Sequence, residues 1–516
     1  MEIKKEKISW TEKVADKTFV VNTDSDVIVP DTKPDIKKIL QVDACAKMTN
    51  SEIQNDRILV NGNVYFNIIY IPDDNTEALQ SIKTQTPFTD VVSFKGINPQ
   101  MVGTFEADIA GVNYKIINGR KFSVKSSVEI SALIGQFVNT DCVNNIVDDN
   151  VQTKSKEIVF LSNSANYAKS FAVNEKIIIP QSEASAAEVI KVTPMINEYT
   201  TKIISNKVIL KGEVKLSCAY TNSVDAEIKV ISGIVPFTEI LDVDGIKAED
   251  LTNIKLFVAD NSYSCQEDAN GEIREIETAS EILVKLFALR EEKLDVVSDC
   301  YATTSKLKTE TVVANLPKKI CDINYEETFK TQINIAENEP KIGKIYDAFS
   351  KAYIEKTEQF NDKLTVSGTI DNYVLYITEQ KDLPIYCIKN EIEFSESFDC
   401  YDNISADGIF NVKTLNTTYT LSDANCVDLR VNIRIDGVMW SDTKTKIITE
   451  VSSESMPILA DVASITVYFV QENDSLWDIA KKYFTTVDAI KRINDGISDE
   501  VQKGMQLLIP KYKNIS

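Results

Sequence analysis

The chain contains no histidine among its 516 residues. This absence excludes Ser-His-Asp and Cys-His catalysis, histidine-ligated zinc and histidine proton shuttles. Carboxylate-only chemistry, such as that of a two-carboxylate glycosidase, is left open because 78 acidic residues supply many possible pairs. The sequence repeats one unit three times, as described below. Three similar units give no reason for one of them to hold a unique acidic pair, so we expect a protein that is not an enzyme.

Cysteine spacing carries no metal or disulfide signature. The nine cysteines are scattered, odd in number and without a Cys-x-x-Cys pair. Such a pattern argues against a structural zinc site and against a disulfide framework. Buried reduced thiols are the simplest interpretation. We expect neither a bound metal nor a cofactor.

Long apolar runs and basic clusters are also missing. No stretch reaches the roughly 18–20 apolar residues of a membrane-spanning helix, and Met1–Lys7 has no apolar core of a signal peptide behind it. A formal net charge of −22 disfavours contact with phosphate backbones. These features predict a cytoplasmic protein without a membrane span and without nucleic acid as a partner.

What the sequence does contain is one unit repeated three times. A glycine follows a strand-like run in each copy, a tyrosine lies eight residues after it, and a phenylalanine recurs farther on; the three sets are Gly62, Tyr70 and Phe88, then Gly212, Tyr220 and Phe237, then Gly368, Tyr376 and Phe394. A glycine inside a strand typically marks a bulge or a close approach of another backbone. We therefore expect these glycines to be structural rather than catalytic.

The alternation of apolar and polar residues predicts strands with one buried face. A short helical turn is expected after Pro34 and Pro340, because Ile36, Ile39 and Leu40 fall at helical spacing. The stretches 135–169 and 289–327, rich in Asn, Asp, Ser, Thr and Lys, are expected to connect the units, with room for further strands. The predicted fold class is mainly β, with three repeated antiparallel β-domains at 1–140, 141–290 and 291–455.

A different pattern follows at residues 463–516, where a strand, two short helices and a closing strand fit into about fifty residues. Leu476, Ile479, Ala480 and Tyr483 form the apolar stripe of the first helix, and Trp477 falls beside that stripe. This small α+β (βααβ) segment resembles a LysM domain through Tyr468-x-Val470, the run 473–480, and the final Gly504-x-x-Leu507-x-Ile509-Pro510. Asn473 stands where that family commonly has glycine, and asparagine also tolerates a left-handed backbone.

The LysM resemblance implies a shallow groove for N-acetylglucosamine-containing glycans, formed by the loop that enters the first helix and the loop that leaves the second. By position, the partner- or glycan-binding residues are Asn473, Asp474, Ser475, Trp477, Ile493, Asn494 and Asp495. A partly exposed tryptophan can stack on a sugar or anchor a protein interface. Two structural alternatives stay open: Trp477 packs on the flank of a small core, and Asn494 only caps its helix.

Three β-units followed by one terminal LysM domain resemble the SipL-like family of clostridial spore-coat morphogenetic proteins. This resemblance implies a non-catalytic scaffold in the mother-cell cytoplasm that is recruited to the forespore surface and spore coat. The implied partners are the coat basement-layer ATPase, stage IV sporulation protein A, and other coat proteins. Two alternatives differ in class: a peptidoglycan-binding protein anchored through LysM, and a wall hydrolase that uses LysM for targeting.

Overall fold

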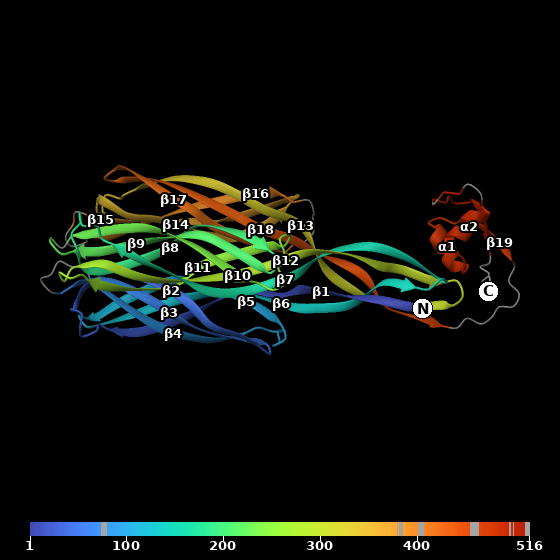
Figure 1. Ribbon diagram of the computed structural model, residues 1–516, viewed down its shortest axis with the longest axis horizontal. Coiled ribbons are helices and arrows are strands. Elements are labelled where there is room, and N and C mark those ends of the chain that lie inside the picture. Colours follow the sequence, from blue (N-terminus) through green and yellow to red (C-terminus); the bar gives the residue numbers. More distant parts are fainter. Residues whose placement is uncertain are drawn as a thin grey trace.

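The computed structural model describes residues 1–73, 80–225, 227–378, 380, 385–400, 407–454, 464–494, 497–498 and 500–510. The molecule is elongated (Figure 1). Long strands form a broad body at one end and a narrow stalk at the other, and a small helical module lies beyond the end of the stalk (Figure 1). The stalk therefore separates the broad body from the helical module (Figure 1).

Three units of six strands build the body and stalk. Unit 1 comprises β1 (Glu2–Ile28), β2 (Ile36–Gln54), β3 (Arg57–Pro72), β4 (Gln80–Ser93), β5 (Val102–Asn118) and β6 (Lys121–Val147). Unit 2 comprises β7 (Val151–Ile178), β8 (Ala186–Ile204), β9 (Lys207–Asn222), β10 (Ile228–Asp242), β11 (Leu251–Glu267) and β12 (Ile273–Ala302). Unit 3 comprises β13 (Lys306–Asn334), β14 (Ile342–Phe360), β15 (Lys363–Thr378), β16 (Ile385–Asp399), β17 (Asp407–Asp423) and β18 (Cys426–Glu454).

Each unit packs two three-stranded antiparallel layers against each other. In unit 1 one sheet has the order β1-β6-β5 and the other β2-β3-β4, and units 2 and 3 repeat this arrangement. In unit 2 a single pair, Ile273 with Ala186, joins the two layers. β3 alternates strictly between buried and half-buried residues from Ile58 to Ile68, and β15 does so from Leu364 to Val374. The predicted repeated antiparallel β-domains are confirmed.

The strand glycines are sites of close approach, as predicted. Gly62 lies opposite Phe88 in the register, Gly212 opposite Phe237 and Gly368 opposite Phe394. A Cβ at Gly212 would lie 2.6 Å from the carbonyl oxygen of Glu198 and 2.7 Å from the ring of Phe237. The aromatic ring covers the space that the glycine leaves, and a bulge in the neighbouring strand faces the same glycine in each unit.

The prediction of a helical turn after Pro34 and Pro340 is wrong. Both segments enter strands, β2 at Ile36 and β14 at Ile342. The register of β2 shifts between Ile36 and Lys38 and again between Ile39 and Gln41. Each bulge adds one residue to the strand, so apolar side chains on one face are spaced by three residues instead of two. Bulged strands thus imitated helical periodicity.

The expected unit boundaries also differ from the structure. The division at 140/141 falls inside β6, and the division at 290/291 falls inside β12. The polar stretches around these points are the solvent-facing sides of long strands, whose inward residues form the core of the stalk. The units meet at the short turns between β6 and β7 and between β12 and β13.

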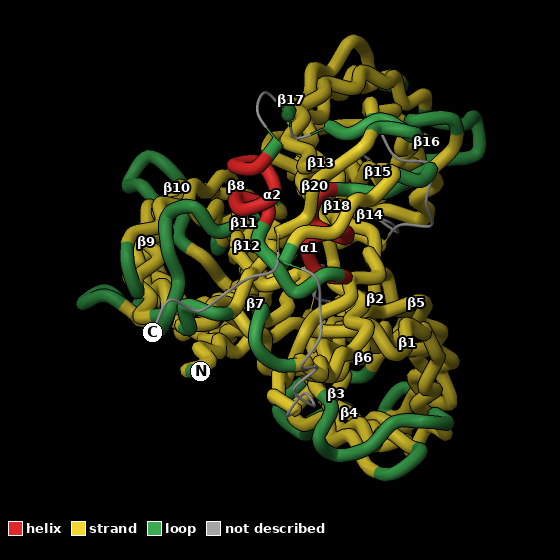
Figure 2. The backbone as a smooth tube through the Cα atoms, turned by 90° about the vertical axis from the view of Figure 1, so that its right-hand side faces the viewer, coloured by secondary structure: helices red, strands yellow, loops and turns green. Residues whose placement is uncertain are grey.

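The three units surround a common axis, and Figure 2 shows them as three lobes. Equivalent residues form layers in the stalk. Trp10, Phe160 and Leu316 occupy the same position in β1, β7 and β13 and share one apolar cluster. Val143, Val297 and Ile448 share the next cluster. The stalk is therefore a single core to which all three units contribute.

The C-terminal module contains β19 (Ile465–Phe469), α1 (Leu476–Lys482), α2 (Val487–Ile493) and β20 (Gln506–Pro510). Its two strands pair antiparallel. The module's core gathers Val470, Leu476, Ile479, Ile490 and Leu507. The predicted βααβ order is confirmed. Neither helix in the described part of the chain is long and apolar enough to cross a membrane.

Candidate functional site

The loop that enters α1 is built around Asn473 and Asp474. Asn473 adopts a left-handed backbone with φ of 68°, which is the conformation expected where glycine is common. Asp474 accepts hydrogen bonds from the Tyr468 hydroxyl at 2.7 Å and from the Gln471 backbone N–H at 2.8 Å. The bond from Tyr468 and then that from Gln471 lower the pKa of the Asp474 carboxyl. Asp474 therefore holds the loop together while Asn473 is exposed.

Ser475 and Asn494 fix the two helix ends. Ser475 is the N-cap of α1 and accepts a hydrogen bond from the Asp478 N–H at 3.2 Å. The Asn494 side chain donates to the Ile490 carbonyl at 2.8 Å and accepts from the Leu508 N–H at 2.8 Å. Asn494 thus ties α2 to β20 and serves the fold directly. Ile493 is half-buried, and Asp495 lies outside the described residues.

Trp477 faces the stalk. Its indole N–H donates to Asp299 Oδ2 at 2.8 Å, near the end of β12. Its ring meets the Tyr301 ring edge-on, with centroids 4.9 Å apart and an interplanar angle of 74°. Such a T-shaped pair stabilises the contact beyond what burial of the two rings contributes. The side chain that the resemblance assigns to ligand binding is here engaged within the chain.

Two further contacts complete this junction. Lys481 forms an ion pair with Asp299 Oδ1 at 2.5 Å, and the Tyr301 hydroxyl donates to the Thr485 carbonyl at 2.9 Å. Burial opposes ionisation of Asp299, but the hydrogen bonds from Lys481 and Trp477 outweigh it and lower the pKa of the carboxyl. We call Asp299 and Tyr301 the seat of the module.

The seat was missed in the sequence, although a signal existed. Ile146, Cys300 and Val451 share one cluster at equivalent places in units 1, 2 and 3. The residue before each is therefore equivalent too, namely Asn145, Asp299 and Glu450. Two positions after Asn145, Asp299 and Glu450 the chain has Val147, Tyr301 and Ser452, respectively. Only unit 2 combines an acid with an aromatic residue, so the seat breaks the threefold equivalence.

The outer face of β19 carries a second feature that the sequence reasoning did not single out. Ile465, Val467 and Phe469 alternate along this strand and are 48%, 50% and 56% exposed. In the register, Val467 lies opposite Leu508. A row of apolar side chains on a two-stranded sheet is a flat surface suited to another protein.

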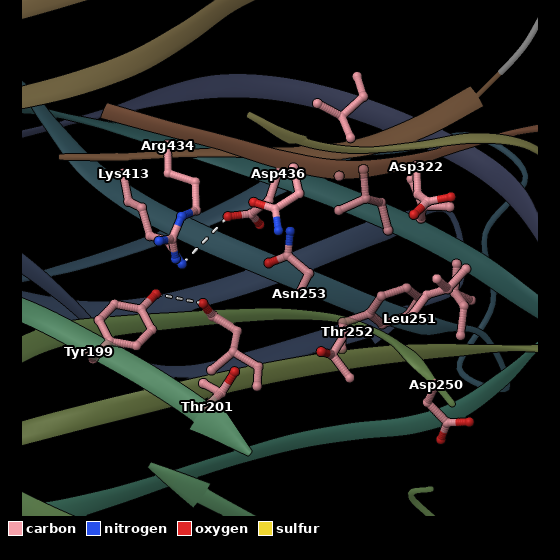
Figure 3. Close-up of a pocket in the computed structure, with 18 residues that line it drawn as sticks. Tyr199, Thr201, Asp250, Leu251, Thr252, Asn253, Asp322, Lys413, Arg434 and Asp436 are labelled. Carbon is pink, nitrogen blue, oxygen red and sulfur yellow. Dashed lines mark hydrogen bonds and ion pairs between the residues drawn. The ribbon is translucent and has the colours of Figure 1, made fainter. Parts of the chain in front are cut away.

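A cavity between units 2 and 3 has a different character (Figure 3). The Tyr199 hydroxyl donates to the Ile254 carbonyl at 2.8 Å, and Lys413 lies 4.6 Å from the centre of the Tyr199 ring. Lys413 also pairs with Asp436 at 3.5 Å. Burial lowers the pKa of Lys413. Lys413 of unit 3 thus contacts a ring of unit 2 and forms an ion pair within its own unit, so this lysine helps pack the two units together.

Comparison with known proteins accounts for most of the architecture. The family model of the SipL SPOCS domain matches residues 35–117, 185–266 and 341–426. The LysM family model matches residues 468–510. No curated protein and no solved structure matches the chain. These domains make it a sporulation-related protein with a module of the peptidoglycan-binding type, and the chain belongs to the SipL-like proteins, with three SPOCS domains followed by one LysM domain.

Proposed function

We propose that the chain is a non-catalytic scaffold of spore-coat assembly whose LysM domain docks onto the coat basement-layer ATPase, stage IV sporulation protein A. In this role it acts in the mother-cell cytoplasm and helps encase the forespore. Other coat proteins are partners of the β-units. The observation that carries the proposal is the apolar face of β19, where Ile465, Val467 and Phe469 are exposed at one end of the molecule.

The choice of a protein partner rests on the shape and chemistry of this face. Sugar recognition in proteins needs a groove with placed polar groups and a free aromatic ring. Trp477, the aromatic side chain assigned to that task, is held by Asp299 and Tyr301. A flat apolar strip without charges suits the core of a protein interface, where charged residues are depleted.

Co-purification tests the proposal. The full chain is expected to capture the ATPase, and a chain ending at Asp461 is expected to lose it. Phe469→Glu should lower capture at least tenfold, because it puts a charge at the most exposed of the three apolar side chains. The matched control is Phe360→Glu at the hairpin end of β14, where the phenylalanine is 77% exposed. Equal capture by the full and truncated chains would move the interface to the β-units.

The second candidate function is binding of peptidoglycan through N-acetylglucosamine. The LysM match and the left-handed Asn473 favour it, because they preserve the family's loop. The full chain should then sediment with insoluble peptidoglycan, and Trp477→Ala should reduce the bound fraction. Asp299→Asn should increase it, since the indole would be less firmly held. Absence of sedimentation for all three chains would remove this candidate.

Absence of catalysis is part of the proposal and has its own test. Purified peptidoglycan incubated with the full chain should release no soluble fragments. Release that persists in a chain ending at Asp461 would identify a hydrolase within the β-units.

Localisation is tested separately. A fluorescent fusion expressed during sporulation should collect around the forespore, and an even cytoplasmic signal would contradict recruitment to its surface.

A further inference from the structure

One pair of thiols in unit 3 lies unusually close. The nine cysteines are free, and five are buried, whereas Cys45, Cys265 and Cys387 are exposed, contrary to the expectation of buried thiols throughout. Cys321 Sγ and Cys400 Sγ are 3.5 Å apart, although the residues are separated by 79 positions. Cys400 is fully buried and Cys321 half-buried. This contact is the starting point of the inference.

The two cysteines connect different sheets. Cys321 is in β13, directly after a bulge, and is paired with Met439 of β18. Cys400 follows β16, and its N–H donates to the Asp362 carbonyl at 2.7 Å, which fixes its backbone. In unit 3, β13 and β16 belong to separate three-stranded sheets without a connecting ladder in the part that the structure describes. A bond between the sulfurs would join the two layers covalently.

The other units provide an internal comparison. The bulge that precedes Cys321 recurs in β1 and β7, where the residues after it are Ala15 and Ala165. The backbone hydrogen bond of Cys400 recurs at Phe94 and Val243. Units 1 and 2 thus place an alanine and a larger apolar residue at these two positions. Unit 3 replaces both with cysteine, and each replacement alone would only make a core thiol.

We propose that Cys321 and Cys400 are the site of an intramolecular disulfide that forms on oxidation and locks the two sheets of unit 3 together. The sulfurs must approach by about 1.5 Å to reach bonding distance. Side-chain rotation of Cys321 supplies this movement on the less buried side. The inference is independent of the partner of the LysM domain.

A low-molecular-weight disulfide such as oxidised glutathione is the oxidant. The Cys321 thiolate attacks one of its sulfurs, breaks that S–S bond and releases one glutathione thiolate, which takes up a proton. The Cys400 thiolate then attacks the Cys321 sulfur and releases the second glutathione. Two cysteine thiols are oxidised and one disulfide is reduced to two thiols, so atoms and electrons balance.

The reaction should be slow at neutral pH and faster in alkali. Burial, followed by the hydrogen bond with Cys400, raises the pKa of the Cys321 thiol to about 12. The reactive thiolate fraction therefore rises roughly tenfold per pH unit between pH 7 and 9. This behaviour suits a lasting cross-link better than a rapidly responding sensor.

The test uses the full-length reduced protein, incubated with oxidised glutathione, alkylated and digested without reduction. A peptide that links Cys321 to Cys400 is expected, and the melting temperature should rise by about 5 °C or more. Cys321→Ala and Cys400→Val copy the residues of unit 2 and are expected to fold. Neither variant should give the linked peptide or the rise in melting temperature on oxidation, whereas Cys426→Ser should give both.

Two outcomes would overturn the proposal. Glutathione attached to Cys321 without a linked peptide would mean that Cys400 cannot complete the exchange. A linked peptide without any rise in melting temperature would mean that the bond does not hold the sheets of unit 3 together.

Discussion

Gly212 illustrates how a single hydrogen atom in place of a methyl group shapes the sandwich. We expect Gly212→Ala to lower the free energy of unfolding by about 2 kcal/mol, because its Cβ would meet a backbone oxygen and the Phe237 ring. Gly233→Ala in β10 is the matched control, since nothing lies within 4 Å of its Cβ position. Denaturant unfolding of both variants measures the difference. Equal stabilities would show that Phe237 moves aside at no cost.

Individual residues were predicted from sequence wherever local chemistry determines them. Asn473 takes the left-handed turn that is expected where the LysM family commonly has glycine. The environment of Trp477 could not be predicted, because Asp299 precedes it by 178 positions. Helical spacing places Trp477 beside the core stripe, but it does not reveal that another unit fills that side.

The junction between α1 and β12 is the element whose behaviour depends on charge. The pKa of Asp299 is lowered in the docked state, so the carboxylate stabilises docking at neutral pH. This contribution is complete above the ordinary carboxyl pKa of about 4 and is lost as pH falls through the lowered pKa. Hydroxyl-radical labelling of Trp477 should therefore rise in acid, with the buried Trp10 as internal reference.

A substitution of Asp299 tests the same contact at neutral pH. Asp299→Asn removes the attraction to Lys481, which is about 1 kcal/mol for a partly exposed pair, and should raise the labelling of Trp477 several-fold. Asp295→Asn, an exposed position of the same strand, should leave it unchanged. Unchanged labelling in Asp299→Asn would show that the aromatic contact with Tyr301 alone holds the module.

Strands were predictable as a class, whereas their length and exact course were not. Alternation identified the repeats, and Gly62 and Phe88 were recognised as recurring markers that the register places face to face. The bulges in β2 imitated a helix, and the polar faces of β6 and β7 were interpreted as connections. The helix-like spacing in β2 comes from its register shifts. In the stalk the buried face is completed by other units, which a local pattern does not contain.

At the scale of the whole molecule, the units are held together by polar contacts as well as by the stalk. Lys215 of unit 2 pairs with Asp347 of unit 3 at 2.7 Å, and the Asp347 side chain is only 5% exposed. Ser217 also donates to this carboxylate, at 3.3 Å. A carboxylate buried to this degree depends on its cation, because its desolvation is not offset by water.

Lys215→Met should therefore destabilise the body by about 3 kcal/mol, since it leaves the Asp347 charge at the interface without its cation. Lys207→Met in the same strand is the control: its pair with Asp242 is exposed on both sides, so a change below about 1 kcal/mol is expected. Thermal unfolding of both variants provides the comparison. If the units unfold together, Lys215→Met lowers the midpoint temperature of a single transition. If unit 3 unfolds first, the curve shows two transitions, and only the midpoint temperature of the earlier one falls. An unshifted curve would mean that the stalk core, and not the polar contacts between the lobes, determines how the three units hold together.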